Sequence, residues 1–415
     1  MCNSLSRVDP EVREILQEEL FRQQKNLTLI PSENYTSKAV LEAESSVLIN
    51  KYAEGYPQKR YYQGCQFGDE IEELAIQRAK KLFKCEHVNV QVHSGTQANM
   101  AVYQALLKPG DVILSLNLSA GGHLSHGKEG TFPYKYHRIV NYGVDKDSER
   151  FNYDEIRRIA RRYRPRLIIV GASAYPRAID FLPWRKIADE VGAYLLADVA
   201  HIIGLIVAGL HPDPVPYADV VTATTQKTLR GPRGGIIICQ KKYASVIDKA
   251  VFPGIQGGPF MHTIAAKAVC FKEASQPEFK EYQRRIISNA KTLARVLKEE
   301  GFRLVSDGTD NHLMIVDLSK NGITGREAAT ILEEAGIIVN KNNIPFDKTP
   351  PSVTSGIRLG TPAVTTRGMG SYEMELIGEW ISRILHHPQD KNLREKIKEE
   401  VEELCEKFPI YKDLE

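Results

Sequence analysis

One lysine and one aspartate have the residue types and the sequence context for carbonyl chemistry. Lys227 follows an apolar, β-branched run at residues 220–222 and precedes a turn rich in Gly, Pro and Arg at residues 230–235. Asp198 ends an earlier apolar run. A lysine at a strand end is usually solvated, and an aspartate after an apolar run is often a helix cap. In pyridoxal-phosphate enzymes, however, a lysine forms a Schiff base with the cofactor aldehyde while an aspartate pairs with the pyridinium nitrogen. The pair therefore suggests pyridoxal-phosphate chemistry.

A phosphate site is predicted at Ser94-Gly95-Thr96, between a short β-branched strand and an Ala-rich helix. Small hydroxyl residues and a glycine at a helix start leave backbone N–H groups free for a phosphate, and the helix dipole adds to the attraction. The same residues also form an ordinary N-cap. The phosphate prediction therefore depends on the lysine.

Arg358 stands between two apolar residues, Ile357 and Leu359. Burying a guanidinium is costly unless it meets a carboxylate in a two-pronged hydrogen bond. Arg358 is therefore predicted to bind a substrate carboxylate, with a structural salt bridge as the alternative.

The elements that must position these residues alternate between strand and helix. Continuous apolar runs at residues 166–171, 193–198 and 234–241 are typical of buried strands in a parallel sheet. Amphipathic patterns predict helices at residues 10–24, 70–83, 154–163, 184–191, 261–274, 279–300, 326–335, 372–384 and 392–408. The alternation predicts βαβ units around a mostly parallel sheet, whose strand C-termini collect the ligands.

Composition excludes several other classes. A chain of 415 residues is long enough for two domains. Its net charge of +3 is spread without a basic block, so we expect neither nucleic acid nor a membrane as partner. No apolar run reaches the roughly 18 residues of a membrane span, and the first residues have no apolar signal core. The six cysteines have no CxxC pair and no zinc spacing. We therefore expect a cytoplasmic protein with reduced thiols and no metal.

Residues 50–65 are rich in Tyr, Gly and charge without the periodicity of a strand or helix. Such a loop carries function or contacts a partner, or it packs on its own body. Two histidines in the glycine-rich stretch GGHLSHG, residues 121–127, are likewise either catalytic or structural.

Several stretches together resemble serine hydroxymethyltransferases, from roughly residue 27 to residue 370. They are TTQKTLRGPRGG, IPSENY, NKYAEGYP, GGHLSHG and TSGIRLGTPAVTTRG. The resemblance implies a pyridoxal-phosphate-dependent α/β enzyme of fold type I, the aspartate aminotransferase-like fold. We expect a large domain with a mostly parallel seven-stranded sheet and a small α+β C-terminal domain. The predicted boundaries are a helical arm at 1–25, the large cofactor-binding domain at 26–278 and the small domain at 279–415.

The resemblance also implies an activity in one-carbon and amino-acid metabolism. Serine and tetrahydrofolate would react reversibly to glycine and 5,10-methylenetetrahydrofolate, with pyridoxal 5'-phosphate as cofactor. An obligate homodimer would carry its active sites at the interface. Carried over by position, Lys227 would form the Schiff base, Asp198 would pair with the ring nitrogen, His123 would stack on the ring and Glu54 would transfer a proton.

The other residues that the resemblance implies form three sets. The cofactor contacts are Ser94, Gly95, Thr96, Ser173, His201 and Gln226, together with Tyr52, Gly257 and Gly258, which reach the phosphate held by the second subunit. Substrate contacts, besides Glu54, are Ser32, Tyr62 and Arg358. Folate contacts are Tyr61, Leu118, Gly122, Leu124 and Asn342.

The sequence departs from the family pattern at Gln226, where the family has a histidine directly before the lysine; Ala120 and Ala223 are milder departures. A glutamine amide can donate a hydrogen bond, but it carries no charge and cannot shuttle a proton. Gln226 is therefore predicted to affect substrate specificity. The alternatives are a hydroxymethyltransferase for an α-substituted serine and an aldolase or transaldolase that works without folate. A binding protein that retains the fold without catalysis is a third, which the presence of Lys227, Asp198, Arg358 and Glu54 disfavours.

Overall fold

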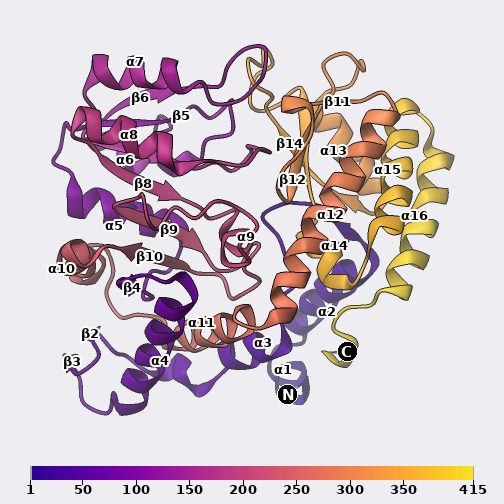
Figure 1. The fold of residues 1–415 in the computed structure, drawn as a ribbon. Coiled ribbons are helices and arrows are strands. Elements are labelled where there is room, and N and C mark those ends of the chain that lie inside the picture. The colour runs from indigo at the N-terminus through magenta and orange to yellow at the C-terminus, as the bar shows by residue number, and fades with distance from the viewer. Residues whose placement is uncertain (1, 415) are drawn as a thin grey trace.

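The centre of the computed structural model, which describes residues 2–414, is a seven-stranded sheet (Figure 1). Met1 and Glu415, the outermost residues of the predicted arm and the predicted small domain, lie outside the described residues. The strand order is β4-β10-β9-β8-β7-β5-β6. The strands are β4 (His87–Asn89), β5 (Val112–Leu116), β6 (Arg138–Tyr142), β7 (Leu167–Val170), β8 (Tyr194–Asp198), β9 (Val220–Thr224) and β10 (Gly235–Cys239).

The sheet is mixed. The pairs from β9 through β8, β7 and β5 to β6 are parallel, whereas β10 runs antiparallel to both β9 and β4. The short connection from β9 to β10 explains the reversal, because a parallel pair needs a crossover of a dozen or more residues. That connection contains Lys227.

Both faces of the sheet are covered, so its inner strands are largely apolar. In β7, Ile168 and Val170 join one apolar cluster while Leu167 and Ile169 join another, because successive side chains point to opposite faces. Helices α5 (Gly95–Leu106) and α10 (Ala244–Lys249) cover one face. The other face is covered by α4 (Gln66–Phe83), α7 (Tyr153–Tyr163), α8 (Phe181–Val191), α9 (Ile203–Val207) and α11 (Met261–Ala274).

A second, four-stranded antiparallel sheet has the order β11-β12-β15-β14 and its own apolar core. Its strands are β11 (Arg303–Leu304), β12 (Leu313–Asp317), β14 (Asn340–Asn342) and β15 (Gly356–Gly360). It packs with helices α12 (Pro277–Glu299), α13 (Gly325–Glu334), α14 (Pro362–Arg367), α15 (Ser371–His386) and α16 (Lys391–Lys407). Leu27 and Leu29 belong to this core as well. On this packing we propose a domain boundary near residue 278, with residues 27–29 packed on the C-terminal side.

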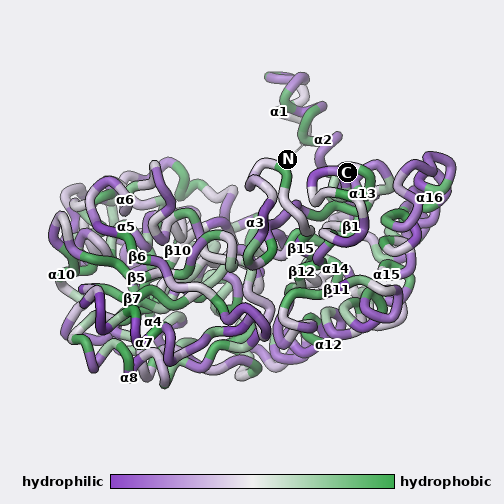
Figure 2. The backbone as a smooth tube through the Cα atoms, turned by 90° about the horizontal axis from the view of Figure 1, so that it is seen from above, coloured by the Kyte–Doolittle hydropathy of each residue, from purple (hydrophilic) through white to green (hydrophobic). Residues whose placement is uncertain are grey.

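The N-terminal third supplies the remaining elements. They are α1 (Cys2–Val8), α2 (Pro10–Lys25), β1 (Leu27–Thr28), α3 (Lys38–Glu44), β2 (Gly55–Tyr56) and β3 (Lys59–Arg60). Two further short elements, α6 (Phe132–Tyr136) and β13 (Ile337–Ile338), lie outside this group. Strand β1 pairs in parallel with β13. In Figure 2, α1 and α2 project from the body, and α2 buries none of its residues.

Local sequence explains several element ends. The Asp180 carboxylate accepts a hydrogen bond from Leu182 N and caps α8, which ends at Gly192 in a left-handed conformation (φ 70°). The cap explains why α8 begins at Phe181, ahead of the predicted start. Among residues 2–414, no helix is long and apolar enough to cross a membrane, and no group of His, Cys, Asp and Glu could hold a metal ion.

Candidate active site

The predicted ligand-binding residues meet in a cavity of about 630 Å³ beside the C-terminal ends of the parallel strands. Segments after β4, β5, β7, β8 and β9 line it, and Asn340, Asn342 and Arg358 of the four-stranded sheet contribute from the other side. Fifteen of the predicted site residues line this one cavity: Ser32, Ser94, Gly95, Thr96, Leu118, Gly122, His123, Leu124, Ser173, Asp198, His201, Gln226, Lys227, Asn342 and Arg358. They come from eight separate parts of the chain.

Lys227 is buried at the cavity, and its ammonium group has no hydrogen-bond or ion-pair partner among residues 2–414. Burial lowers the pKa of the amine to about 8; the negative charge of Asp198 raises the pKa, and the positive charge of Arg358 lowers it. By contrast, hydrogen bonds hold the backbone of Lys227 in place. The Lys227 carbonyl accepts from Asn34 Nδ2 (2.9 Å) and from Arg230 N (3.0 Å). A fixed backbone and an unpaired amine of lowered pKa are the conditions for a nucleophilic lysine.

Asp198 ends β8 and holds its charge through three hydrogen bonds. Its Oδ2 accepts from Asn99 Nδ2 (2.8 Å) and from His126 Nε2 (2.8 Å), and its Oδ1 accepts from Ala200 N (3.2 Å). Burial raises the pKa of the Asp198 carboxyl, but the hydrogen bonds from His126 and Asn99 and the electrostatic interactions with the nearby histidines together outweigh burial and leave the pKa lowered. The carboxylate therefore stays ionised, as a partner for a protonated ring nitrogen must.

The residues around Asp198 were not predicted. Asn99 is buried in α5, where its Oδ1 accepts from Thr222 Oγ1 (2.7 Å) and its Nδ2 also donates to Ser125 Oγ (2.9 Å). His126 is the second histidine of GGHLSHG and is also buried. A buried asparagine in an Ala-rich helix was the signal available in the sequence, since such an amide needs partners.

His123 borders the cavity with a neutral ring. Its Nδ1 lies 2.8 Å from Ser125 Oγ and 3.2 Å from Ser125 N. Burial lowers the pKa of His123 to about 4, against the opposing charge of Asp198. The turn before it needs glycine, because Gly121 has φ 104° and a Cβ there would lie 2.5 Å from Ala174 O.

Ser94 caps α5, and the start of this helix faces the cavity. Its Oγ accepts from Gln97 N (3.3 Å) and donates to Gln97 Oε1 (3.0 Å). A Cβ on Gly235 would lie 2.5 Å from Ser94 O, so the two backbones can approach only because residue 235 is a glycine. The open amide groups of Gly95 and Thr96 form a site of the kind that binds phosphate.

Arg358, on β15, has no carboxylate partner among residues 2–414, so it does not form the structural salt bridge that was the alternative prediction. Its Nε donates to Asn340 Oδ1 (3.1 Å) and its Nη1 to Ser173 O (2.6 Å), and it forms no ion pair among residues 2–414. Burial lowers the pKa of the guanidinium to about 10. An enclosed guanidinium with donors left over and no counter-ion is suited to a carboxylate that arrives with a ligand.

Gln226 borders the cavity beside Lys227. Its Oε1 accepts weakly from Gly234 N (3.4 Å), so the amide oxygen is engaged by the backbone. The amide NH₂ group is left as the donor that Gln226 can offer to a ligand.

Three of the remaining predicted residues line a different cavity, and the other three lie close to them. Glu54, Tyr61 and Gly257 line it together with residues 252–256, and it shares no lining residue with the Lys227 cavity. Tyr62 Oη donates to Glu54 Oε2 (2.9 Å), and the rings of Tyr52 and Tyr62 meet edge to face at 5.5 Å. Tyr52 also lies against Gly258. The hairpin β2–β3 carries this group in the segment where the sequence showed no periodicity, because two-residue strands are too short to show one.

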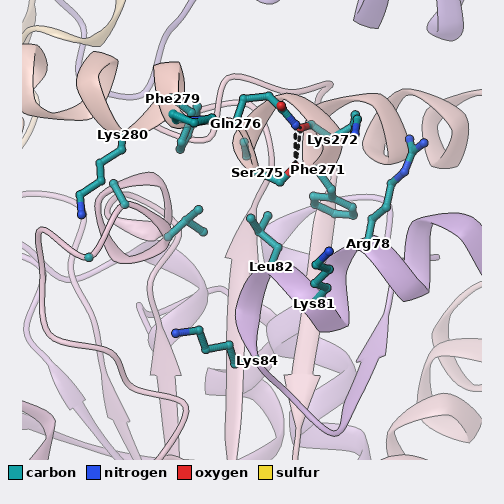
Figure 3. Close-up of a pocket in the computed structure, with 15 residues that line it drawn as sticks. Arg78, Lys81, Leu82, Lys84, Phe271, Lys272, Ser275, Gln276, Phe279 and Lys280 are labelled. Atoms are coloured by element: carbon teal, nitrogen blue, oxygen red, sulfur yellow. Dashed lines mark hydrogen bonds between the residues drawn. The ribbon is translucent and has the colours of Figure 1, made fainter.

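A larger cavity, of about 800 Å³, lies elsewhere (Figure 3). It lies between α4, α11 and the start of α12, with Arg78, Lys81, Lys84, Lys272 and Lys280 around an apolar floor. It contains no carboxylate, histidine or cysteine beside these cations. General acid–base and nucleophilic chemistry therefore favour the smaller cavity.

An unpaired lysine amine, an ionised carboxylate, a neutral imidazole and an open helix N-terminus around one cavity fit pyridoxal phosphate, and the α/β fold fits its fold type I enzymes. A family model described as serine hydroxymethyltransferase matches residues 5–381. The chain therefore belongs to the serine hydroxymethyltransferase family. Enzymes of this family are pyridoxal-phosphate-dependent transferases that act on serine, glycine and folate, and they are typically oligomeric.

Proposed function

We propose that this protein transfers the hydroxymethyl group of serine reversibly to tetrahydrofolate, forming glycine and 5,10-methylenetetrahydrofolate. The observation that carries the proposal is Arg358, whose guanidinium faces the Lys227 cavity without a carboxylate partner. An amino-acid carboxylate bound there would hold the α-amino group near the lysine.

Each residue of the cavity would have a separate task. Arg358 binds the substrate carboxylate, and Asp198 keeps a proton on the ring nitrogen of the cofactor. His123, which lines the cavity, would lie against the cofactor ring and fix its plane, and so select the bond at the α-carbon that is broken. Bound pyridoxal phosphate supplies an electron sink for the carbanion that this bond cleavage produces. Leu118, Leu124 and Asn342, which also line the cavity, would contact the pterin.

Glu54 is the proposed proton-transfer group, and it lies in the other cavity. We propose that a second copy of the chain brings its Glu54 and Tyr62 to the Lys227 cavity, with Tyr52, Gly257 and Gly258 reaching the phosphate. Exposure supports this: Tyr52, Tyr61 and Tyr62 are 58%, 70% and 44% exposed in the single chain. Tyrosines left in solvent on an ordered hairpin are typical of a contact surface.

Gln226 favours a second candidate function. The neutral amide replaces a residue that can carry charge, so the amino acid accepted could be an α-substituted serine, or the reaction could be a folate-independent aldol cleavage. The variant Gln226→His separates these possibilities. Selectivity is the kcat/KM for serine divided by the kcat/KM for α-methylserine. If the natural substrate is serine, this selectivity should differ by less than about tenfold between the Gln226→His variant and the unsubstituted protein, the lower end of the effect of one methyl group in a pocket.

The test of the proposed function is the visible spectrum of the purified holoenzyme with glycine, before and after tetrahydrofolate is added. A long-wavelength band that grows sharply with folate would show that glycine and folate share one site. A spectrum that changes with amino acids and ignores folate would contradict folate-dependent transfer and favour the aldolase. Glu54→Gln is the matched variant, because it should abolish the folate effect while retaining cleavage of bulkier β-hydroxy amino acids.

A further inference from the structure

Two buried histidines meet behind the Lys227 cavity, one from each sheet region. His201 follows β8 and borders the cavity, and His312 precedes β12 and is fully buried. His201 Nδ1 lies 3.3 Å from His312 Nε2, and the rings are stacked with centroids 5.5 Å apart. No predicted role included His312.

Hydrogen bonds hold the backbone of both histidines in place, so the contact between the two rings is a fixed part of the structure. The His201 carbonyl accepts from Thr228 Oγ1 (2.9 Å), next to the lysine. The loop before His312 is held to the segment after β7, since Asn311 Nδ2 donates to Tyr175 O (3.0 Å). The His312 carbonyl accepts from Thr361 N (3.1 Å). The contact between the rings therefore links the two sheet regions at the site.

At neutral pH each ring carries one hydrogen. Burial, together with the charges of Arg358 and Lys227, lowers the pKa of His312 to about 3. Burial, then Lys227 and Arg358, also lower the pKa of His201. Two neutral imidazoles can share only one hydrogen between them. Either His201 donates through Nδ1 or His312 donates through Nε2.

The other nitrogen of His312 decides between these arrangements. Its Nδ1 is buried and has no hydrogen-bond partner among residues 2–414. If His201 donated, the hydrogen of His312 would sit on Nδ1 as a buried donor without an acceptor. If His312 donates, Nδ1 is only a bare acceptor. Unpaired buried donors are the rarer case in proteins, so the second arrangement is favoured.

We infer that His312 is a positioning residue: by donating from Nε2 to His201 Nδ1, it holds His201 in the tautomer whose hydrogen lies on Nε2 and faces the cavity. His201 is then a donor beside the cations Lys227 and Arg358, where an anion is expected. Naming that anion as the amino-acid carboxylate rests on the proposed function. The tautomer itself does not.

The test compares His312→Phe, which keeps an aromatic ring but cannot donate, with His312→Gln, whose amide nitrogen can occupy the position of Nε2. The first readout is ¹⁵N NMR of histidine-labelled holoenzyme, with the His201 signals assigned by their absence from a His201→Asn sample. Protonated Nε2 and unprotonated Nδ1 are expected at His201 in the unsubstituted protein and in His312→Gln. In His312→Phe the two nitrogens should shift toward a mixture of tautomers.

The second readout is glycine affinity, measured from the visible spectrum. It should fall about tenfold in His312→Phe, as for a lost hydrogen bond to a charged group, and be largely restored in His312→Gln. A merely structural role would weaken both variants alike. A hydrogen on His201 Nδ1 in the unsubstituted protein, or an unchanged His201 tautomer in His312→Phe, would overturn the inference. The expected tautomers without folate-dependent transfer would instead contradict the proposed function alone.

Discussion

The two cavities that hold the predicted site residues differ in how complete they are within one chain. Around Lys227, hydrogen bonds hold the charged groups of Asp198 and Arg358 in place. Around Glu54, the aromatic neighbours are largely in solvent. On the proposed function, one chain would already hold the cofactor-binding groups in place, whereas proton transfer would require a second copy of the chain.

The largest effect is expected for Lys227→Ala. Without its amine, the Lys227 cavity loses its nucleophile, and activity should fall by roughly 10⁴-fold or more, the scale for removing a covalent catalytic residue. Steady-state rates of serine cleavage measure it. Lys272→Ala, in the 800 Å³ cavity, is the matched lysine control and should retain full activity. Substantial activity in Lys227→Ala would remove the distinction between the cavities.

Mixing two inactive variants tests whether the cavities act across subunits. Lys227→Ala and Glu54→Gln should each be inactive alone. After unfolding and refolding together, half of the dimers are mixed and each contains one intact pair, so about a quarter of the original activity should return. The assay is folate-dependent serine cleavage, with differently tagged chains to show that mixed dimers form. Mixed dimers without activity would place Glu54 and Lys227 in the same subunit's reaction.

Arg358→Lys should sharpen the assignment of the carboxylate site. A lysine keeps the charge but loses the two-pronged geometry, so the KM for serine should rise by about 10–100-fold with a smaller change in kcat. Arg177→Lys is the control, because Arg177 pairs with Asp310 outside the cavity. Equal effects of both substitutions would indicate a general loss of stability.

The smallest expected effect is the dependence of the rate of cofactor capture on pH. Burial lowers the pKa of the Lys227 amine from 10.5 to about 8, and only the neutral amine attacks an aldehyde. The rate at which apoprotein captures pyridoxal phosphate should therefore rise about tenfold per pH unit below pH 8 and level off above it. Stopped-flow absorbance measures the rate. A rise that continues to pH 10 would mean that the lysine is solvated.

Local patterns in the sequence predicted much of this arrangement. Asp198 and Lys227 each follow an apolar strand, and strand ends converge, so their meeting could be expected. Their roles came from the family resemblance. Asn99 and His312 could not be found in the same way, because hydrogen bonds between segments far apart in sequence leave no periodic pattern. That Arg358 has no counter-ion among residues 2–414 likewise could be learned only from the structure, because it depends on where every carboxylate lies.

The pairing of β1 with β13 has a consequence for synthesis of the chain. Leu27 and Thr28 leave the ribosome early, but their partners Ile337 and Ile338 follow only after all strands of the seven-stranded sheet and two strands of the four-stranded sheet have been made. Ser32, which borders the cavity just after β1, is therefore fixed late. Contacts of such long sequence separation form slowly. A nascent chain can thus build its central sheet well before it can bind a substrate, and a truncated product would carry the reactive lysine without a finished pocket.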